Sequence, residues 1–243
     1  MSCLIVGASS GLGRSLAYTL ARNNFDLILV SSDISDLKPI SKHLSYLYKV
    51  KIECIAANAA NSDLFAKALF RKIINYKDIE YVFFPMGVSF DGDNIEISNH
   101  RLRELMNINF ESIIMTCNFI LTNQTFSKLK TIVGFGSIAT ARARKNNVIY
   151  TAAKAALQFY FQSIKHAFAD KINIQFYIPG YLLSQQSIYK NLVFKPASTD
   201  KFSELILKNI NKNFEFKFFP FYWIFISFLI KKIPWVLFKR LNF

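Results

Sequence analysis

Cysteine is scarce in this sequence of 243 residues. Only Cys3, Cys54 and Cys117 occur, and their odd number and wide spacing indicate neither a disulfide framework nor a zinc motif. The three histidines also lack the spacing of metal ligands, so no metal site is predicted. The start, MSCLIVGASSGLG, has no basic leader and only a short apolar run, so we expect no signal peptide and a reduced, cytoplasmic setting.

Acidic residues are also few: 16 stand against 30 basic ones, which gives a formal net charge of +14. Such a balance favours contact with nucleic acid, acidic lipid headgroups or phosphorylated substrates. A coding bias toward Lys, Asn and Ile would produce the same excess. Because the basic residues are dispersed and no nucleic-acid-binding motif is recognised, a nucleic-acid partner ranks last.

Long apolar runs are missing, although 52% of the residues are hydrophobic and 25 are phenylalanine. Residues 219–230 form an apolar stretch that stops at Lys231 and Lys232, short of the roughly 20 residues that a bilayer span requires. Aromatic and aliphatic residues flanked by basic ones favour a helix that lies in the lipid headgroup region. The alternative is that the segment 219–243 packs on the domain or on a second subunit.

What the sequence does contain is a regular alternation of apolar strands and helical stretches. The strand-like runs are CLIVG, FDLILV, KIECIAA, YVFFPMG, TIVGFGS and INIQFYIPG, and a seventh strand is plausible at residues 214–218. Continuous apolar strands separated by helices indicate a parallel sheet buried on both faces. The sequence therefore predicts an α/β fold, a three-layer doubly wound parallel sheet (Rossmann fold), in one domain over residues 1–218 with a tail at 219–243.

The first turn of this pattern, GASSGLG, places three glycines where a strand becomes a helix: Gly7, Gly11 and Gly13. Glycine at such a turn lets the backbone approach a pyrophosphate at the helix N-terminus. Glycine-rich turns are common, but this one is the first βα turn of a doubly wound pattern, where nucleotides bind. Dinucleotide binding is therefore favoured over a simple tight turn.

The spacing Gly-x-x-x-Gly-x-Gly resembles that of the short-chain dehydrogenase/reductase family, and the resemblance covers residues 1–184. It implies that the dinucleotide lies along this turn, against Gly7, Ser9, Ser10, Gly11, Leu12 and Gly13. At the end of the second strand an acidic residue would favour NAD and a basic one NADP. This chain has Ser31 and Ser32 there, which favour NADP only slightly over NAD because Asp33 follows them.

Two positions depart from the family pattern. An aspartate that touches the adenine in many members is replaced by Asn58, which could keep a hydrogen bond. The usual Asn-Asn-Ala-Gly after the fourth strand is FPMG, so only Gly87 is retained and the packing beside the adenine must differ. Both changes suggest a divergent subgroup.

The residues for chemistry follow the fifth strand. Ser137 closes that strand, and YTAAK opens the next long helix with Tyr150 and Lys154 on one helical face. A lysine ammonium beside a phenol favours the phenolate and lowers a pKa that starts near ~10, which suits a general acid working near neutrality. Asn109 stands where the family places its fourth catalytic residue.

The resemblance implies a role for each of these residues. Tyr150 would protonate the carbonyl oxygen and Ser137 would hold it, while Lys154 would bind the nicotinamide ribose and Asn109 a water. Tyr150 and Lys154 would thus also contact the cofactor. Further cofactor contacts are implied for the residues after the sixth strand, Pro179, Gly180 and Ser184.

For the substrate, the sequence offers less. The loop RARK contains Arg142, Arg144 and Lys145 close to Ser137, either as a solvated charge cluster or as a clamp for a phosphorylated substrate. The tail loosely resembles that of bacterial reductases acting on lipid-linked or cell-envelope keto-sugars. The leading hypothesis is thus an NAD(P)H-dependent carbonyl reductase, with a small-molecule or lipid-linked substrate and peripheral contact with the inner face of the membrane.

Two alternatives remain at this stage. One is a soluble reductase of acyl or steroid-like ketones, with the tail in a dimer interface, and a homo-oligomer is expected in either case. The other is a non-catalytic dinucleotide-sensing module.

Overall fold

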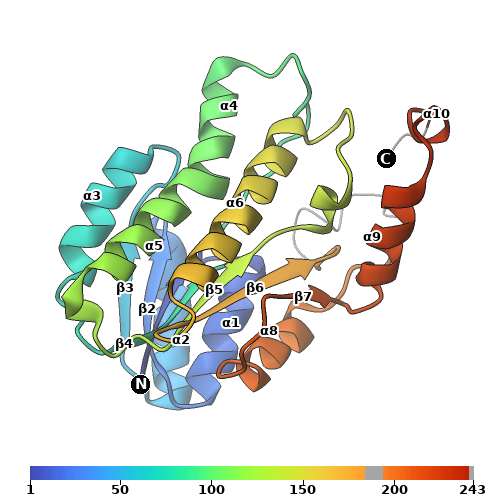
Figure 1. The fold of residues 1–243 in the computed structure, drawn as a ribbon. Coiled ribbons are helices and arrows are strands. Elements are labelled where there is room, and N and C mark those ends of the chain that lie inside the picture. Colours follow the sequence, from blue (N-terminus) through green and yellow to red (C-terminus); the bar gives the residue numbers. More distant parts are fainter. Residues whose placement is uncertain (184–193, 241–243) are drawn as a thin grey trace.

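The computed structural model describes residues 1–183 and 194–240, and Ser184 therefore lies outside the described residues. Its centre is a parallel sheet of seven strands in the order β3-β2-β1-β4-β5-β6-β7 (Figure 1). The strands are β1 (Ser2–Val6), β2 (Asp26–Ser31), β3 (Ile52–Ala56), β4 (Ile79–Phe84), β5 (Thr131–Phe135), β6 (Asn173–Pro179) and β7 (Phe216–Phe219). The predicted doubly wound parallel sheet is confirmed.

Helices cover both faces of this sheet (Figure 1). One face carries α3 (Ser62–Ile73), α5 (Ser112–Thr122) and α6 (Val148–Ala167), and the other carries α1 (Gly11–Arg22), α2 (Ile34–Tyr48) and α8 (Thr199–Lys208). The remaining helical segments are α4 (Asn99–Met106), the π-helical η1 (Asn107–Glu111), the 3-10 turns η2 (Gln124–Phe126) and η3 (Ile138–Ala141), and the tail helices α9 (Trp223–Lys232) and α10 (Trp235–Phe238).

The two faces of the sheet explain why its strands read as unbroken apolar runs. Successive side chains of a strand point to opposite faces. In β1, Leu4 and Val6 join the core under α3, α5 and α6, whereas Cys3 and Ile5 join the core under α1, α2 and α8. A polar side chain in an interior strand is thus buried on either face, and Gln175 of β6 meets this condition by donating to the carbonyls of Asn209 and Lys212.

The strand order reverses beside β1, which pairs with β2 on one side and with β4 on the other. In doubly wound sheets the connections that follow β1 and β4 run in opposite directions, so the carboxyl ends of these two strands border a crevice. A large cleft lies there, lined from the glycine turn after β1 to the loops after β4, β5 and β6. The sheet thus positions one site at its carboxyl edge.

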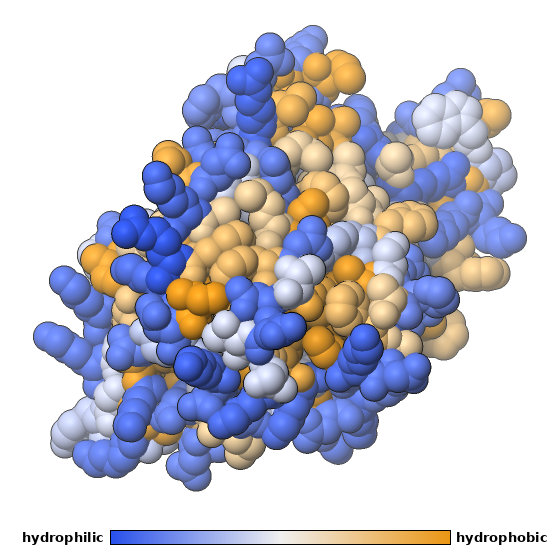
Figure 2. All heavy atoms as spheres, turned by 60° about the vertical axis from the view of Figure 1, so that its left-hand side comes forward, coloured by the Kyte–Doolittle hydropathy of each residue, from blue (hydrophilic) through white to orange (hydrophobic). Residues whose placement is uncertain are grey.

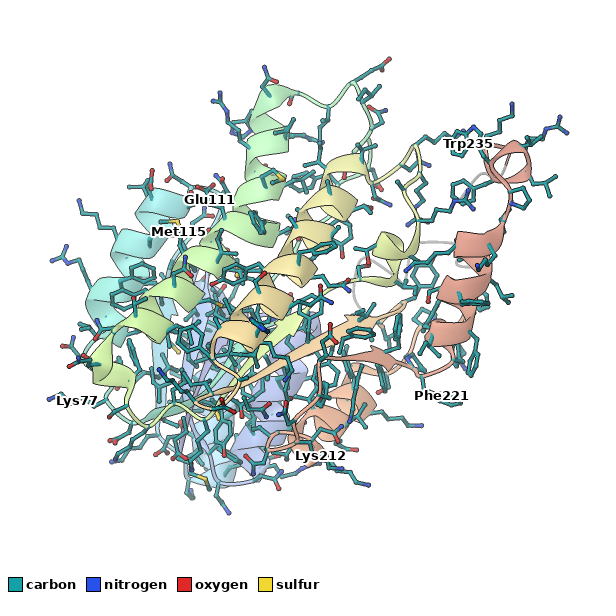
Figure 3. All side chains as sticks on the ribbon, in the orientation of Figure 1. Lys77, Glu111, Met115, Lys212, Phe221 and Trp235 are labelled. Carbon is teal, nitrogen blue, oxygen red and sulfur yellow. The ribbon has the colours of Figure 1, made fainter. Side chains whose placement is uncertain are left out.

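The tail continues the sheet before it leaves it. β7 pairs in parallel with β6 and ends at Phe219, so the strand extends one residue past the predicted seventh strand at 214–218. Phe219 stacks on Phe202 of α8 with 4.2 Å between ring centroids, and its carbonyl accepts a hydrogen bond from the Gly180 N–H at 2.8 Å. Beyond it, α9 and α10 lie past the last strand, with Phe221 shortly before α9 and Trp235 at the start of α10 (Figure 3).

The described part of the chain has no helix that is long and apolar enough to cross a membrane. Two large tail side chains are instead buried, Trp223 with 4% and Phe238 with 5% of their surface exposed, and Ser227 of α9 is buried as well. The tail therefore has one side attached to the domain, and its other side is considered below.

Candidate active site

The glycine turn after β1 is held against the neighbouring strand. The backbone N–H groups of Gly7 and Ala8 both donate to the Val30 carbonyl at 2.9 Å. Gly7 has a φ of +99°, and a Cβ on Gly13 would lie 1.9 Å from the Gly7 carbonyl oxygen. Because only glycine has this freedom and this small size, the turn needs glycine at both positions.

Polar groups at this turn face the cleft. Helix α1 begins at Gly11, and the hydroxyl of its N-cap residue Ser10 forms no capping hydrogen bond. Ser9, Ser10 and Leu12 line the cleft beside the first N–H groups of the helix. Free N–H groups and the positive end of the helix dipole favour an anion at this point. The residues present thus fit a pyrophosphate.

The end of β2 carries the residues expected to distinguish the two dinucleotides. Ser31 and Ser32 line the cleft, and the Ser31 hydroxyl oxygen accepts a hydrogen bond from the Asp33 N–H at 3.4 Å. Asp33 caps helix α2 by accepting from the Ser35 N–H at 2.8 Å, and this hydrogen bond lowers the pKa of its carboxyl group. Asp33 thus serves the helix that follows it.

A basic residue that the sequence analysis missed lines the same cleft. Arg14 stands in the first turn of α1, directly after Gly13, and both Arg14 and Tyr18 are among the lining residues. The available signal was its position directly after the last glycine of the turn, in a cleft that Ser31 and Ser32 also line. Arg14 is therefore a candidate partner for a phosphate on the ribose.

The adenine-side and central positions also line the cleft. Asn58 accepts a hydrogen bond from the Ala60 N–H at 2.9 Å, which closes an Asx turn. Gly87 lies deeper, where a Cβ would approach the Asn109 Oδ1 to 2.9 Å and the Lys154 Nζ to 3.0 Å. Gly87 is thus the point at which the loop after β4 meets two predicted catalytic side chains.

Asn109 is fully buried in the π-helical segment between α4 and α5. Its Nδ2 donates to the Val88 carbonyl at 2.8 Å and to the Leu105 carbonyl at 3.0 Å, and its Oδ1 accepts from the Val88 N–H at 3.2 Å. A single π-helical turn is rare and is often found at functional sites. Here it carries an amide that ties the loop after β4 to the helix.

Ser137 and Tyr150 form a hydrogen-bonded pair at the carboxyl end of β5. Ser137 begins the turn η3, and its hydroxyl oxygen accepts from the Ala139 N–H at 3.1 Å. Burial raises the pKa of Tyr150, while the Ser137 hydrogen bond and the positive charge of Arg144 act in the opposite direction. Arg144 is thus a cation that favours the phenolate, and the effect of Lys154 on this pKa stays a prediction.

Lys154 is buried, with 3% of its surface exposed, one helical turn after Tyr150. Its Nζ donates to the backbone carbonyls of Met86 at 3.3 Å and of Phe135 at 3.2 Å. Burial lowers the pKa of Lys154 to about 8, because the charged ammonium loses its hydration. The ammonium thus points to the ends of β4 and β5, where a bound nicotinamide ribose would add further acceptors.

The helix that carries Tyr150 and Lys154 is capped from a distance. Asp93, in the loop after β4, is only 2% exposed, and its two carboxylate oxygens accept from the N–H groups of Ile149 and Tyr150, each at 2.9 Å. These donors would otherwise lack partners at the N-terminus of α6. Sequence reasoning missed this residue because no local pattern pairs Asp93 with a helix that begins at Val148.

The loop after β6 meets the tail at the rim of the cleft. Pro179 and Gly180 line the cleft, and a Cβ on Gly180 would lie 1.8 Å from the indole Nε1 of Trp223. Gly180 therefore allows the first residue of α9 to pack on the loop. The predicted cofactor contact Ser184 follows this loop, outside the residues that are described.

Two basic residues of the loop RARK point to different parts of the protein. Arg142 turns to the tail, where its Nη1 donates to the carbonyl of Ile230 at 2.9 Å and to that of Ile233, and its guanidinium lies 4.0 Å from the Phe238 ring centroid. Arg144 instead lines the cleft. The predicted cluster is thus neither wholly solvated nor a single clamp.

The described residues contain no group of three or more side chains suited to hold a metal ion. What the cleft offers is a glycine turn with free donors at one end and a Ser-Tyr pair with a buried lysine at the other, both at the carboxyl ends of parallel strands. The first part fits a dinucleotide, and the second fits proton transfer to a carbonyl oxygen.

Comparison with known proteins places this arrangement among related sequences. A family model described as short chain dehydrogenase matches residues 2–191. The human inactive hydroxysteroid dehydrogenase-like protein 1 is 22% identical over 195 residues, which cover 79% of this chain and 59% of that protein. The Bos taurus very-long-chain 3-oxoacyl-CoA reductase is 20% identical over 241 residues, 97% of this chain and 77% of that protein. The chain spans 56% to 63% of the length of the first three curated relatives.

Solved structures share the whole fold. A short-chain dehydrogenase from Sphingobium yanoikuyae in complex with NADPH has a TM-score of 0.84 and 19% identity, with 100% of this chain and 96% of that chain covered. The bulky-bulky ketone specific alcohol dehydrogenase from Comamonas testosteroni has a TM-score of 0.81 and 18% identity, with 99% and 94% covered. At these identities the likeness confirms the fold, including the region of the tail.

Proposed function

The chain belongs to the short-chain dehydrogenase family, and from that premise we propose that it is an NADP(H)-dependent oxidoreductase that reduces a carbonyl group to an alcohol, or catalyses the reverse. The observation that carries this proposal is the hydrogen-bonded pair of Ser137 and Tyr150 beside the buried Lys154, at the strand ends that border the dinucleotide turn. Tyrosine as a proton donor needs such partners, because a free phenol titrates near ~10.

The protein's own part in the reaction is to position the reactants and to transfer a proton. When bound, the dinucleotide supplies or accepts the hydride. Tyr150 then donates a proton from its hydroxyl to the carbonyl oxygen, and the Ser137 hydroxyl donates a hydrogen bond to the same oxygen. The Lys154 ammonium holds the ribose and stabilises the phenolate left on Tyr150, and Asn109 keeps the loop beside Gly87 in place through its bonds to Val88.

The cofactor is a nicotinamide dinucleotide, NADP or NAD, as in the family members that hold NADPH or NAD(P) analogues. NADP is the preferred one in this proposal. Ser31 and Ser32 can donate to a 2′-phosphate, and the Arg14 side chain adds a positive charge to the same end of the cleft. Asp33 weighs less against NADP than its charge suggests, because its carboxylate caps α2.

The reaction takes place at an anionic membrane surface in this proposal. Large apolar side chains of the tail are exposed along its whole length, at Phe221, Tyr222, Ile224, Phe225, Phe228, Leu229, Trp235, Val236 and Leu237. Lys231, Lys232, Lys239 and Arg240 stand beside them, so apolar and positive groups share one segment. That combination matches a bilayer with acidic headgroups, which accepts apolar side chains and attracts each basic residue by about 1 kcal/mol. The expected location is the inner face of the membrane.

An amphipathic ketone is the substrate class that fits this location. Trp223 and Arg142 join the tail to the loops after β6 and β5, so the exposed apolar face stands beside the entrance of the cleft. A lipid-linked keto-sugar is such an amphipathic ketone. A long-chain 3-oxoacyl compound is another, and several curated relatives are named as reductases of very-long-chain 3-oxoacyl-CoA. In both cases the lipid part would remain near the bilayer while the carbonyl reaches Tyr150.

A soluble reductase of acyl or steroid-like ketones, with the tail in a dimer interface, is the second candidate. A second apolar surface bears on this candidate: Phe159 of α6 is 72% exposed, and half-buried apolar residues of α5 such as Met115 lie on the same side of the sheet. Figure 2 displays a band of apolar side chains bordered by hydrophilic ones. Because this surface can form a homo-oligomer without the tail, it leaves the tail available for the membrane.

A non-catalytic dinucleotide-sensing module is the remaining alternative, and a curated relative bears the word inactive in its name. Against it stands the buried Lys154, whose ammonium loses hydration at a cost in stability. A module that only senses a dinucleotide has no need for this cation beside Tyr150.

The test combines activity with membrane binding. NADPH oxidation is measured with short soluble ketones and with amphipathic ketones dispersed in vesicles that contain anionic lipid. We expect amphipathic ketones to be reduced faster. Co-sedimentation with the same vesicles compares the wild type with Phe225→Ser/Phe228→Ser, which alters side chains that are 62% and 60% exposed. We expect at least a tenfold loss of vesicle affinity, about 1.4 kcal/mol.

The matched control is Phe159→Ser, which removes an equally exposed phenylalanine outside the tail. If this control loses as much vesicle affinity as the tail variant, or if soluble ketones outperform every amphipathic one, the membrane part of the proposal is wrong. If no ketone supports NADPH oxidation, the reductase proposal itself is wrong. Substitutions serve better here than a truncation at residue 218, because that cut would remove Phe219 and Trp223 from the rim of the cleft.

A further inference from the structure

Two neighbouring arginines after Ser137 have opposite environments. Arg142 is fully engaged: it donates to two carbonyls at the end of α9 and lies over the Phe238 ring. A helix leaves its last carbonyls without partners, so this guanidinium acts as a C-terminal cap of the tail helix. Arg142 therefore has a structural role, and the contacts of its guanidinium described above are all with the tail.

Arg144 has no such task. Its side chain is half-buried and lines the cleft, and its Nε is buried without a hydrogen-bond partner among the described residues. The ion pairs formed within the described residues do not include it either. A buried donor without a partner is costly, and an arginine fork carries five donors. Among residues 1–183 and 194–240, the Nε of this cation thus lacks an acceptor.

The place of this cation relates it to the reaction. Arg144 is close enough to Tyr150 for its charge to favour the phenolate. The reacting carbonyl oxygen must lie within hydrogen-bond reach of the Tyr150 hydroxyl. A group bound by Arg144 would therefore belong to the same substrate molecule, near its carbonyl. The cleft that Arg144 lines is mixed in character: apolar Val88, Ile138 and Leu182 and polar Asn146 and Asn147 also belong to its lining.

We propose that Arg144 is a specificity-determining residue that binds an oxyanion, a phosphate or a carboxylate, carried by the substrate close to its reacting carbonyl. The proposal rests on the reductase function above and deepens it by naming the substrate class: an amphipathic ketone with a nearby oxyanion. A planar guanidinium matches both oxyanions with two parallel hydrogen bonds. The formal charge of +14 also favours the approach of an anion to the cleft.

Two sources can supply the oxyanion, the phosphate of a lipid-linked sugar or the carboxylate of an oxo acid. The experiment separates them with pairs of ketones of equal length. One pair differs by a carboxylate near the ketone, and the other by a phosphate. The measured quantity is the ratio of kcat/KM for the charged to the neutral member, taken for the wild type and for three variants.

We expect Arg144→Met to lower this ratio about tenfold for the pair whose oxyanion the site binds, and Arg144→Lys to keep part of it, because the charge remains while the fork is lost. The tenfold loss corresponds to about 1.4 kcal/mol. Removal of the Arg144 charge also affects Tyr150 with every substrate, and the ratio cancels that common effect. Arg142→Met is the matched control, and it should change the two members of a pair alike.

A ratio that stays the same in Arg144→Met for both pairs overturns the proposal, and so does an equal fall in Arg142→Met. Binding provides a readout that does not depend on turnover. Calorimetry with dodecyl phosphate and with dodecanoate, in the presence of NADP, should give at least tenfold weaker binding of one of them to Arg144→Met than to the wild type. If no ketone is reduced but this difference is found, the reductase function fails while the oxyanion site stands. If binding is also unchanged, both fail.

Discussion

The two ends of the cleft are built in different ways. The phosphate-binding part of the dinucleotide end comes from residues 7–13, a single turn whose glycines and serines are adjacent in sequence. The substrate end depends on distant partners, since Trp223 packs on Gly180 and Arg142 bonds to Ile230, 88 positions later in the chain. A short motif thus suffices for the cofactor end, whereas the substrate end takes its shape from tertiary contacts that can vary without disturbing the turn.

The strongest test of this comparison lies where the two ends meet, at Tyr150. We expect Tyr150→Phe to reduce kcat by about 10²–10⁴, the range typical for loss of a general acid. NADPH affinity should remain within about twofold, because the glycine turn is untouched. Steady-state kinetics and fluorescence titration with NADPH measure the two effects.

The matched control for Tyr150→Phe is Tyr160→Phe on the same helix. The Tyr160 hydroxyl lies away from the cleft and donates to the Asn118 Oδ1 at 2.7 Å. It should retain near wild-type kcat. Equal losses in the two variants would mean that the helix, and not the phenol in the cleft, is what the substitution disturbs.

How far the sequence predicts this molecule follows the same division. The apolar strands and the glycine turn are local signals, and they predicted the fold and the family. The spacing of Ser137, Tyr150 and Lys154 brought these side chains to one end of the sheet, where the structure also has them. Local signals could not reveal that Asp93 caps the helix of Tyr150 or that Arg142 caps the tail helix, because each depends on partners in another element.

One electrostatic relation inferred from the sequence stays a prediction. The spacing of Tyr150 and Lys154 suggested that the ammonium lowers the pKa of the phenol. In the protein alone the Lys154 Nζ bonds to the carbonyls of Met86 and Phe135, and the nearby charge is that of Arg144. Helical spacing predicts a shared face, but the ends of β4 and β5 decide where the ammonium points.

Burial of the Lys154 ammonium between the two ends of the cleft costs free energy of folding. Its pKa is lowered by burial from 10.5 to about 8, so below pH 8 the folded state holds a charge that it disfavours. Between pH 8 and 10.5 the unfolded state binds more protons, so this cost fades as the pH rises. We expect Lys154→Met to abolish turnover and to stabilise the fold at pH 7 by about 1–3 kcal/mol, with the gain smaller at pH 10.

Urea unfolding at pH 7 and pH 10 measures this gain. The control is Lys128→Met, which removes an exposed lysine paired with Asp78 and should leave stability at pH 7 nearly unchanged, because solvent screens an exposed ion pair. If Lys154→Met is destabilised at pH 7, the two carbonyl hydrogen bonds of Lys154 outweigh its desolvation. The buried ammonium would then be a structural link between β4 and β5.

The smallest expected effect tests whether the cofactor end is as local as its motif suggests. Arg14 lies outside the glycine spacing, yet its side chain lines the cleft with Ser31 and Ser32. Arg14→Ala should weaken NADPH binding about tenfold, or about 1.4 kcal/mol, and leave NADH binding nearly unchanged. Titration of both dinucleotides measures the preference, with Arg22→Ala on the same helix as a control, because Arg22 pairs with Glu204 at its far end. An equal loss for NADPH and NADH would assign Arg14 to the shared pyrophosphate, and the preference for NADP would then depend on the two serines alone.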